Sequence, residues 1–220
     1  MTTNTNPKTT TATKKGEAEV IRSYGPFGEG GVHGVTFDGT LVWFARENEL
    51  VAFDPESGEV KRRLDVPAAA AGTAFDGENL YQLAEPDILV VRPTDGKVLR
   101  RIPAPKGGGN SGMAYADGYL WVGQYRASKI HQVDAKTGEV VKTITSDRFV
   151  TGVSCVGGAL WHGALESDKP AELRRLARDG SVEESLTVKE TQHIAGIEAN
   201  GKGDFWCGGA AGKVLLVRPR

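Results

Sequence analysis

Two histidines and one glutamate are the side chains of this sequence best suited to acid–base chemistry. His33 and His193 each stand shortly before a glycine that opens a strand-like segment, Gly34 and Gly196. A neutral imidazole can act as a general base or bind a metal ion near pH 7. Glu198 follows Gly196 by two residues, where the corresponding residues of the other segments are small, and burial of a carboxyl group there would raise its pKa. We therefore predict His33, His193 and Glu198 as catalytic residues.

A second group of polar side chains recurs at related places along the chain. They precede the first strand or follow the second strand of repeated segments, so we expect them to lie on one face of the fold, where loops on a rigid scaffold carry function. The predicted ligand-binding residues are Arg46, Glu47, Glu85, Asn110, Gln124, Tyr125, Arg126 and Glu166, and Thr151 occupies a similar leading segment. Such a mixture of charged and amide groups on one concave surface indicates a binding site for a small molecule or peptide.

An internal repeat sets the positions of these side chains. A glycine opens each unit, at Gly34, Gly72, Gly112, Gly152 and Gly196, with spacings of 38, 40, 40 and 44 residues. A large aromatic residue follows each glycine, at Trp43, Tyr81, Trp121, Trp161 and Trp206. Turns containing Gly58, Gly96, Gly138 and Gly180 recur with the same period, and alternating apolar stretches lie between the markers. Alternation is the pattern of half-buried strands, and the chain has no convincing helical period.

Four short strands in each unit of about 40 residues are typical of propeller blades. The sequence predicts an all-β fold, a five-bladed β-propeller of four-stranded antiparallel blades. The fifth unit stops after a third strand, and residues 16–26 resemble the missing fourth strand, so we expect the N-terminal strand to close the last blade. The predicted domain is 16–220, and the polar, Thr-rich residues 1–15 are predicted to be a disordered tail. An open or six-bladed arrangement through oligomerisation is the alternative.

Composition narrows the class of protein. The formal net charge is -1, and no run of like charge indicates a nucleic-acid or membrane surface. The N-terminus has no apolar segment typical of a signal peptide, and no apolar run approaches the roughly 20 residues of a membrane span. We predict a cytoplasmic monomer that binds neither nucleic acid nor membrane.

Cys155 and Cys207 are the only cysteines, too few for a disulfide framework. Together with His162 they could form a metal site across adjacent blades, but their spacing is not that of a zinc module. The favoured interpretation is packing between blades, where a free cysteine behaves as a small hydrophobe. The five repeated aromatic residues are likewise predicted to be core.

Two resemblances to known propellers add expectations about activity. The segment HGVTFDGTLVWFARENELVAFDP, residues 33–55, resembles the blades of streptogramin B lyases and of related NHL and YVTN propellers. This resemblance implies a metal-assisted elimination, with His33 as the base and a divalent ion, Mg or Ca, held by Glu47, Glu85 or Glu198. Arg46 stands where the lyase blades carry a carboxylate, and Glu47 comes one residue later.

The segments FGEG, residues 27–30, and NLYQLAEPDILVVRPTDGKVLRRIPAP, residues 79–105, resemble five-bladed glutaminyl cyclotransferases. That family makes pyroglutamate from N-terminal glutamine, and Phe44 stands where its first-blade glutamate would be. We therefore predict a propeller that binds a small molecule or peptide at the mouth of its central channel, with lyase-like or glutaminyl-cyclotransferase-like catalysis. A non-catalytic module for protein or ligand binding is the alternative.

Overall fold

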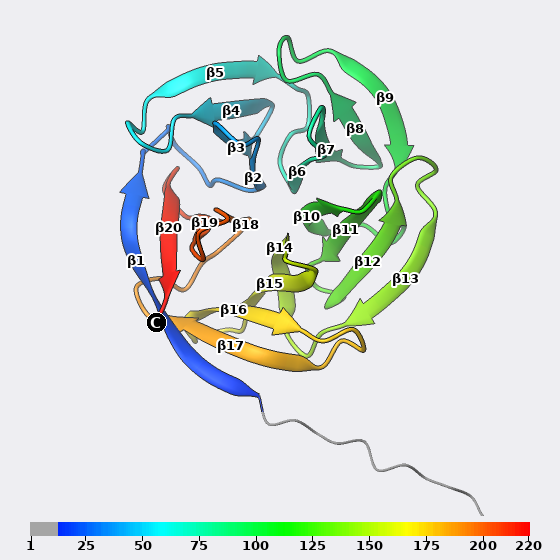
Figure 1. Ribbon diagram of the computed structural model, residues 1–220. Coiled ribbons are helices and arrows are strands. Elements are labelled where there is room, and N and C mark those ends of the chain that lie inside the picture. Colours follow the sequence, from blue (N-terminus) through cyan, green and yellow to red (C-terminus); the bar gives the residue numbers. More distant parts are fainter. Residues whose placement is uncertain (1–12) are drawn as a thin grey trace, which may run out of the picture.

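Short antiparallel strands joined by tight turns build the molecule. A computed structural model describes residues 13–220, which form twenty strands and no helix (Figure 1). No segment of the described chain forms a helix long and apolar enough to cross a membrane. The strands form sheets arranged around a central axis, as the repeat predicts for a propeller-type fold.

Three of the sheets contain four strands in sequence order. The first comprises β2 (Val35–Phe37), β3 (Val42–Arg46), β4 (Glu49–Phe53) and β5 (Val60–Asp65). The second comprises β6 (Thr73–Phe75), β7 (Leu80–Ala84), β8 (Asp87–Val91) and β9 (Val98–Pro103). The third comprises β10 (Asn110–Ala116), β11 (Tyr119–Gln124), β12 (Lys129–Asp134) and β13 (Val140–Thr145).

The fourth sheet contains eight strands and joins both ends of the chain. It comprises β14 (Phe149–Val156), β15 (Ala159–Leu165), β16 (Ala171–Leu176), β17 (Val182–Val188), β18 (Ile197–Ala199), β19 (Phe205–Gly208), β20 (Val214–Pro219) and β1 (Lys14–Tyr24). The N-terminal strand β1 pairs antiparallel with β20, as the sequence predicts. Figure 1 shows β1 outside β20 at the rim.

Two details differ from the prediction. The first residues of β1, from Lys14 to Ala18, also pair in parallel with β17, so two predicted blades share one sheet instead of forming separate sheets. Strand β1 begins at Lys14, two residues before the predicted domain boundary, because the strand is long enough to bridge neighbouring units. The rest of the predicted tail, residues 1–12, lies outside the described residues.

The repeated glycines pack against one another around the axis. A Cβ atom on any of Gly34, Gly72, Gly112, Gly152 or Gly196 would lie closer than 3.0 Å to backbone atoms of the next unit. The chain of contacts returns from Gly196 to the backbone of His33 and Val35, so the last unit meets the first. Only glycine permits so close a backbone approach, which explains the first marker of the repeat.

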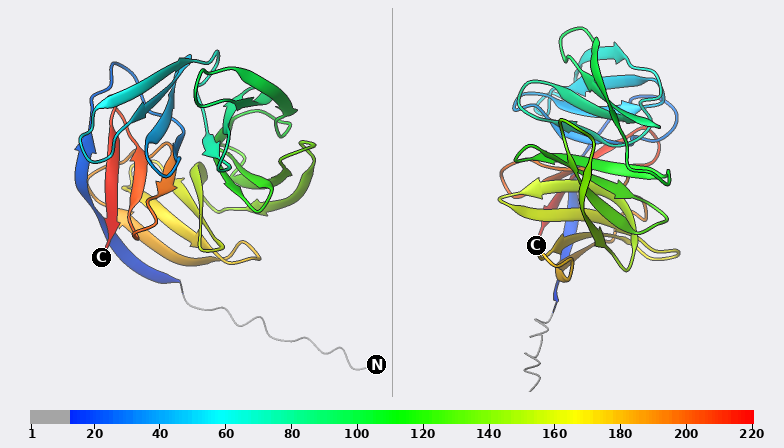
Figure 2. Two further views of the ribbon diagram at one scale, coloured as in Figure 1. Left: turned by 45° about the horizontal axis from the view of Figure 1, so that its top comes forward. Right: turned by 90° about the vertical axis from the view of Figure 1, so that its right-hand side faces the viewer.

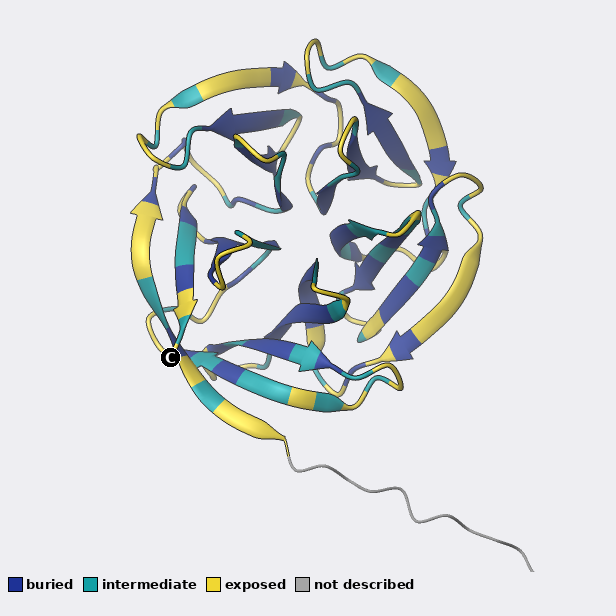
Figure 3. Cartoon of the chain, in the orientation of Figure 1, coloured by how far each residue is buried: buried dark blue, intermediate teal, exposed yellow. Residues whose placement is uncertain are grey.

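Burial falls from the axis to the rim, as Figure 3 shows. Inner strands such as β3 and β7 are almost wholly buried. The outer strands β5, β9 and β13 are mostly exposed, with one buried residue in each. Of the five aromatic markers, Trp43, Tyr81, Trp161 and Trp206 are buried and Trp121 is partly buried. They pack between neighbouring units, where large rings bury much apolar area.

Because consecutive strands run antiparallel, the connections alternate between the two faces seen edge-on in Figure 2. The segments that lead into the innermost strands and the turns after the second strands lie on one face, which we call the mouth face. The turns between first and second strands, and between third and fourth strands, lie on the opposite face.

Candidate functional site

A cavity of about 320 Å³ opens at the centre of the mouth face. Segments that lead into innermost strands supply most of its lining, since they converge on the axis. The lining residues are His33, Ala70, Ala71, Gly109, Asn110, Ser111, Tyr125, Thr151, His193 and Ala195. The walls are mainly apolar, and the polar groups are two imidazoles, one amide and the hydroxyl groups of serine, threonine and tyrosine. This composition suits a small organic ligand oriented by a few polar contacts.

His33 is the half-buried imidazole of this cavity. Burial lowers its pKa below the usual 6.5, the neighbouring His193 acts in the same direction, and Glu47 opposes them. A lowered pKa keeps the His33 ring neutral at pH 7, the form that can accept a proton or a hydrogen bond. His193 is exposed on the same rim. The two predicted catalytic histidines therefore lie in one site.

Asn110 is buried at the start of β10, and its amide orientation is determined by its neighbours. The Nδ2 group donates to Glu85 Oε1 at 2.8 Å and to the Pro105 carbonyl at 3.1 Å. Both partners are acceptors, so the amide nitrogen must face them. The Oδ1 atom of Asn110 has no hydrogen-bond partner among the described residues. A buried acceptor without a partner is costly, so a donor from a ligand or from water would stabilise it.

Tyr125 lines the cavity and packs against Phe149, with ring centroids 5.0 Å apart. Its position after the second strand of the third unit is the one predicted for a ligand-binding residue. Glu85 acts behind the cavity, where its carboxylate also accepts a hydrogen bond from the Asn110 backbone amide at 2.8 Å. It therefore positions Asn110 and does not line the cavity itself.

Glu198 lies on the innermost strand β18 of the last unit and is not among the residues that line the cavity. Its carboxyl group accepts hydrogen bonds from the hydroxyl groups of Thr36 and Ser154, both at 3.2 Å. Burial raises the pKa of Glu198 to about 7, and these hydrogen bonds oppose the rise. The raised pKa agrees with the expectation for this position, but the residue is not part of the cavity wall.

Arg46 and Glu47 lie on the mouth face but outside the cavity, in the wall of a neighbouring pocket. The Arg46 guanidinium group donates to the backbone carbonyls of Glu29 and Phe27, and so anchors the segment before β2. Glu47 is exposed with a φ of 56° in the turn after β3. Its negative charge acts to raise the pKa of His33, against the effect of burial.

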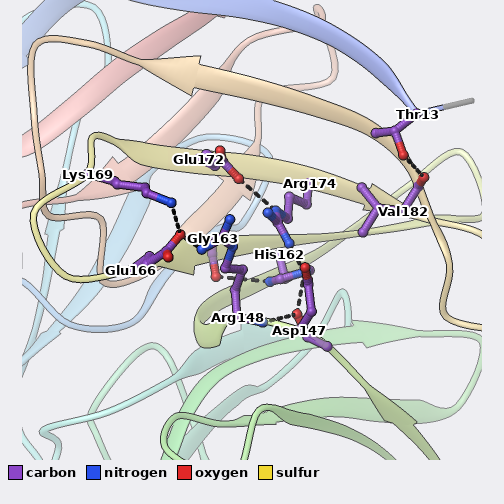
Figure 4. Close-up of polar contacts among 11 residues, drawn as sticks. Thr13, Asp147, Arg148, His162, Gly163, Glu166, Lys169, Glu172, Arg174 and Val182 are labelled. Atoms are coloured by element: carbon purple, nitrogen blue, oxygen red, sulfur yellow. Dashed lines mark hydrogen bonds and ion pairs between the residues drawn. The ribbon is translucent and has the colours of Figure 1, made fainter.

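The remaining predicted ligand-binding residues have partners or positions away from the cavity. Gln124 is buried and bonds through Nε2 to the Lys106 carbonyl and through Oε1 to His131. Glu166 pairs with Lys169 and Arg148, as Figure 4 shows for the Lys169 contact. Arg126 is exposed and is not part of the lining.

His162 and Cys207 are buried in the core, and Cys155 is partly buried against it. His162 is fully buried, with Nδ1 hydrogen-bonded to the Gly163 carbonyl at 3.0 Å, and burial lowers its pKa to about 4 (Figure 4). Burial raises the pKa of both thiols, that of Cys155 to about 12. Among residues 13–220, no three histidine, cysteine or acidic side chains gather closely enough to hold a metal ion.

The donor set of the cavity can be compared with the divalent ion that the lyase resemblance implies. Magnesium and calcium ions prefer carboxylate and carbonyl oxygens. The cavity wall offers two imidazoles, an amide and hydroxyl groups, and Glu47, Glu85 and Glu198 lie outside it. Because no carboxylate is part of the cavity wall, these side chains do not fit a magnesium or calcium site.

Five small residues of the lining were not predicted from the sequence as site residues: Ala70, Ala71, Gly109, Ser111 and Ala195. Each stands one to three residues before a repeat glycine, in the same leading segment as His33. An alignment of the five units on their repeat glycines could have located these residues from the sequence. Their small side chains leave the volume that the cavity occupies.

Comparison with known proteins supports the propeller-type fold. No protein-family profile and no curated protein matches the chain. Among solved structures, glutaminyl cyclase of Myxococcus xanthus is similar with a TM-score of 0.76 and 18% identity, over 94% of this chain and 98% of that one.

Two further structures are less similar. The WD40 β-propeller domain of Doa1 has a TM-score of 0.55 and 18% identity, over 83% of this chain and 62% of that chain. Hydrazine synthase of Kuenenia stuttgartiensis has a TM-score of 0.55 and 15% identity, over 80% and 55%. At these identities the likeness shows the fold alone.

Proposed function

We propose that this chain is a five-bladed β-propeller that binds a small molecule or peptide, through an N–H donor of the ligand, in the cavity of the mouth face. The five-blade count is supported by the five glycine contacts around the axis, of which the last returns to the first unit. In that count the eight-stranded sheet is two blades joined by the parallel pairing of β1 with β17.

The observation that carries the binding proposal is the acceptor of Asn110. Its Oδ1 atom is buried beside an apolar cavity and lacks a partner among the described residues, while Glu85 and Pro105 prevent the amide from turning. A ligand amine or carboxamide supplies the missing donor. The neutral imidazole of His33 offers a second acceptor in the same cavity.

A catalytic form of this proposal is ring closure of N-terminal glutamine, the reaction implied by the second resemblance. The α-amine nitrogen attacks the side-chain amide carbon, a new C–N bond forms, the bond to the amide nitrogen breaks, and ammonia leaves. One proton must move from the attacking nitrogen to the leaving nitrogen. His33 is the group suited to carry it, because a neutral imidazole accepts and returns a proton near pH 7.

Binding and turnover can be separated in one set of experiments. Calorimetry with glutamine-initiated dipeptides, free amides and primary amines tests binding, and mass spectrometry of the same mixtures tests loss of ammonia. We expect Asn110→Ala to weaken binding about tenfold or more. Lys136→Ala, an exposed substitution in the β12–β13 turn on the opposite face, serves as the matched control.

Each outcome distinguishes the alternatives. Ammonia release that disappears in His33→Ala supports the catalytic form. Binding without turnover supports the non-catalytic alternative. Absence of binding by every amide and amine up to about 10 mM, a concentration at which even millimolar affinity would be seen, would contradict the proposal.

A further inference from the structure

A second hollow, of about 660 Å³, lies on the opposite face between the last unit and the first. We call it the opposite groove and define it by Arg22, Tyr24, Phe37, Gly39, Thr40, Asp54, Pro55, Glu56, Asn200, Lys202, Asp204, Trp206, Leu216 and Arg218. Its residues come from the β2–β3, β4–β5 and β18–β19 turns of the opposite face and from the strands β1, β2, β19 and β20 beside them. It is therefore distinct from the site of the proposed function.

The indole of Trp206 is the unusual group of this groove. The side chain is 5% exposed, and its Nε1 atom has no hydrogen-bond partner among the described residues. Its ring packs against Phe37, with centroids 4.7 Å apart. A buried N–H group without an acceptor loses its hydration and gains nothing in return, so its presence needs a reason.

In the first two units, an aspartate of the repeat provides this acceptor. In the first unit, Asp38 Oδ1 accepts the amides of Thr40 and Leu41, and Oδ2 accepts the indole N–H of Trp43 at 2.6 Å. In the second unit, Asp76 caps its turn in the same way and accepts the hydroxyl group of Tyr81 at 3.0 Å. In each of these units, one aspartate thus caps the turn and also accepts the hydrogen bond of the aromatic marker.

The last unit has an asparagine at this place. Asn200 Oδ1 caps the turn through the amides of Lys202 and Asp204, as aspartate does. The second polar atom of Asn200 is an NH₂ group, which donates to Asp204 Oδ2 at 3.2 Å and cannot accept from an indole.

Asp204, the carboxylate that receives the NH₂ group of Asn200, already has a cationic partner. Asp204 takes the guanidinium group of Arg218 through both of its oxygens, at 2.8 and 3.1 Å. The donor of Trp206 is therefore left for an acceptor from outside the described chain.

The groups around Trp206 indicate what that acceptor would be. Lys202 is exposed and has no carboxylate within 4.0 Å among the described residues. Arg22 stacks on Tyr24 and donates to the backbone carbonyls of Pro55 and Glu56. Three cations and three carboxylates line the groove, so attraction would come from the available donors of Trp206 and Lys202 and not from net charge.

We propose that the opposite groove binds a small carboxylate-bearing molecule with an apolar or aromatic body. The carboxylate accepts the indole N–H of Trp206 and lies near the ammonium group of Lys202. The body packs on the apolar side chains of Phe37 and Leu216. An N–H donor and a cation together select a carboxylate over a neutral carbonyl, because charge-assisted hydrogen bonds are about twice as strong as neutral ones.

Indole N–H resonances test this proposal directly, because the chain has four tryptophans and each gives one side-chain signal. Trp206→Phe identifies the Trp206 signal by its disappearance. Phenylacetate is the probe, and phenylacetamide is the neutral control. We expect phenylacetate to move the Trp206 signal downfield, with the Trp43 signal unchanged because Asp38 already accepts its donor.

Lys202→Gln should weaken phenylacetate binding about tenfold, whereas Lys97→Gln, in an exposed turn of the second unit on the same face, should leave it unchanged. The wild-type titration and the Lys202→Gln variant keep the test valid if Trp206→Phe fails to fold. No shift of the Trp206 signal up to about 20 mM phenylacetate would overturn the proposal and leave a groove filled with water. Equal binding of phenylacetamide would overturn the carboxylate class.

Discussion

The first unit, β2–β5, and the last unit, β18–β20 with β1, are built on the same strands but differ at two polar positions. On the innermost strand, Thr36 of the first unit corresponds to Glu198 of the last. At the turn that follows, Asp38 corresponds to Asn200. The first unit satisfies the indole of its aromatic marker within itself, whereas the last leaves an indole donor unpaired among the described residues and holds a carboxyl group near the axis.

This difference separates what the architecture requires from what it only permits. Every unit needs its glycine and its large aromatic residue, because backbone approach at the axis and packing between units depend on them. The polar residues beside these markers are free to vary. Departures from the repeat therefore locate functional candidates, as the last unit shows with Glu198 and Asn200.

The largest effect is expected from a change to one of the repeat glycines, which all units share. In Gly196→Ala the new Cβ would lie beside the His33 carbonyl and 2.7 Å from the Val35 amide, where backbone cannot give way. We expect a loss of at least about 3 kcal/mol in the free energy of unfolding, measured by denaturant titration. Gly201→Ala is the control, because it meets nothing within 4 Å but has a φ of +72°, and should cost only about 1 kcal/mol. Equal losses would show that the glycine contacts are not tight.

The next largest effect concerns Glu198, which stands in the last unit where the first unit has Thr36. Burial raises the pKa of Glu198 from 4.5 to about 7. Between these pH values the folded protein holds a proton that the unfolded chain has released, so stability should fall as pH rises through this window. Glu198→Gln should remove this fall, about 2 to 3 kcal/mol between roughly pH 4 and pH 8.

Urea denaturation of both proteins at several pH values measures the difference. Glu78→Gln, at an exposed turn, is the control and should leave the pH profile unchanged. A wild-type profile that matches that of Glu198→Gln would mean that the Glu198 carboxyl ionises as freely in the folded protein as in the unfolded chain.

A smaller effect is expected when the first unit is made to resemble the last. Asp38→Asn keeps an oxygen to cap the turn but removes the acceptor of the Trp43 indole. We expect a loss of about 1 kcal/mol in thermal or chemical denaturation. The Trp43 indole N–H signal should also move upfield. An unchanged signal would contradict the account of why Trp206 lacks a partner.

The smallest effect concerns the strand that joins the last unit to its neighbour. Lys14 pairs with Glu184 at 2.9 Å, but the lysine side chain is 75% exposed. Exposed ion pairs contribute little, so Lys14→Ala should change stability by no more than about 0.5 kcal/mol in denaturant titration. A loss above about 1 kcal/mol would show that the parallel pairing of β1 with β17 depends on this contact.

The sequence by itself determined the repeat, the all-β character, the antiparallel pairing of β1 with the last strand and the convergence of His33, Asn110, Tyr125, Thr151 and His193 on one mouth. These follow from local periodicity, because a strand alternates by two residues and a repeated unit places equivalent segments on the same face. Only the tertiary structure decided which polar side chains remained available. Arg46 and Gln124 donate to backbone carbonyls of other segments, and Glu166 forms an ion pair with Lys169. Glu85 accepts a hydrogen bond from Asn110 and so positions it. The unpaired atoms of Asn110 and Trp206 likewise appear only when every neighbour is in place, because hydrogen-bond satisfaction depends on three-dimensional contacts that no spacing along the chain records.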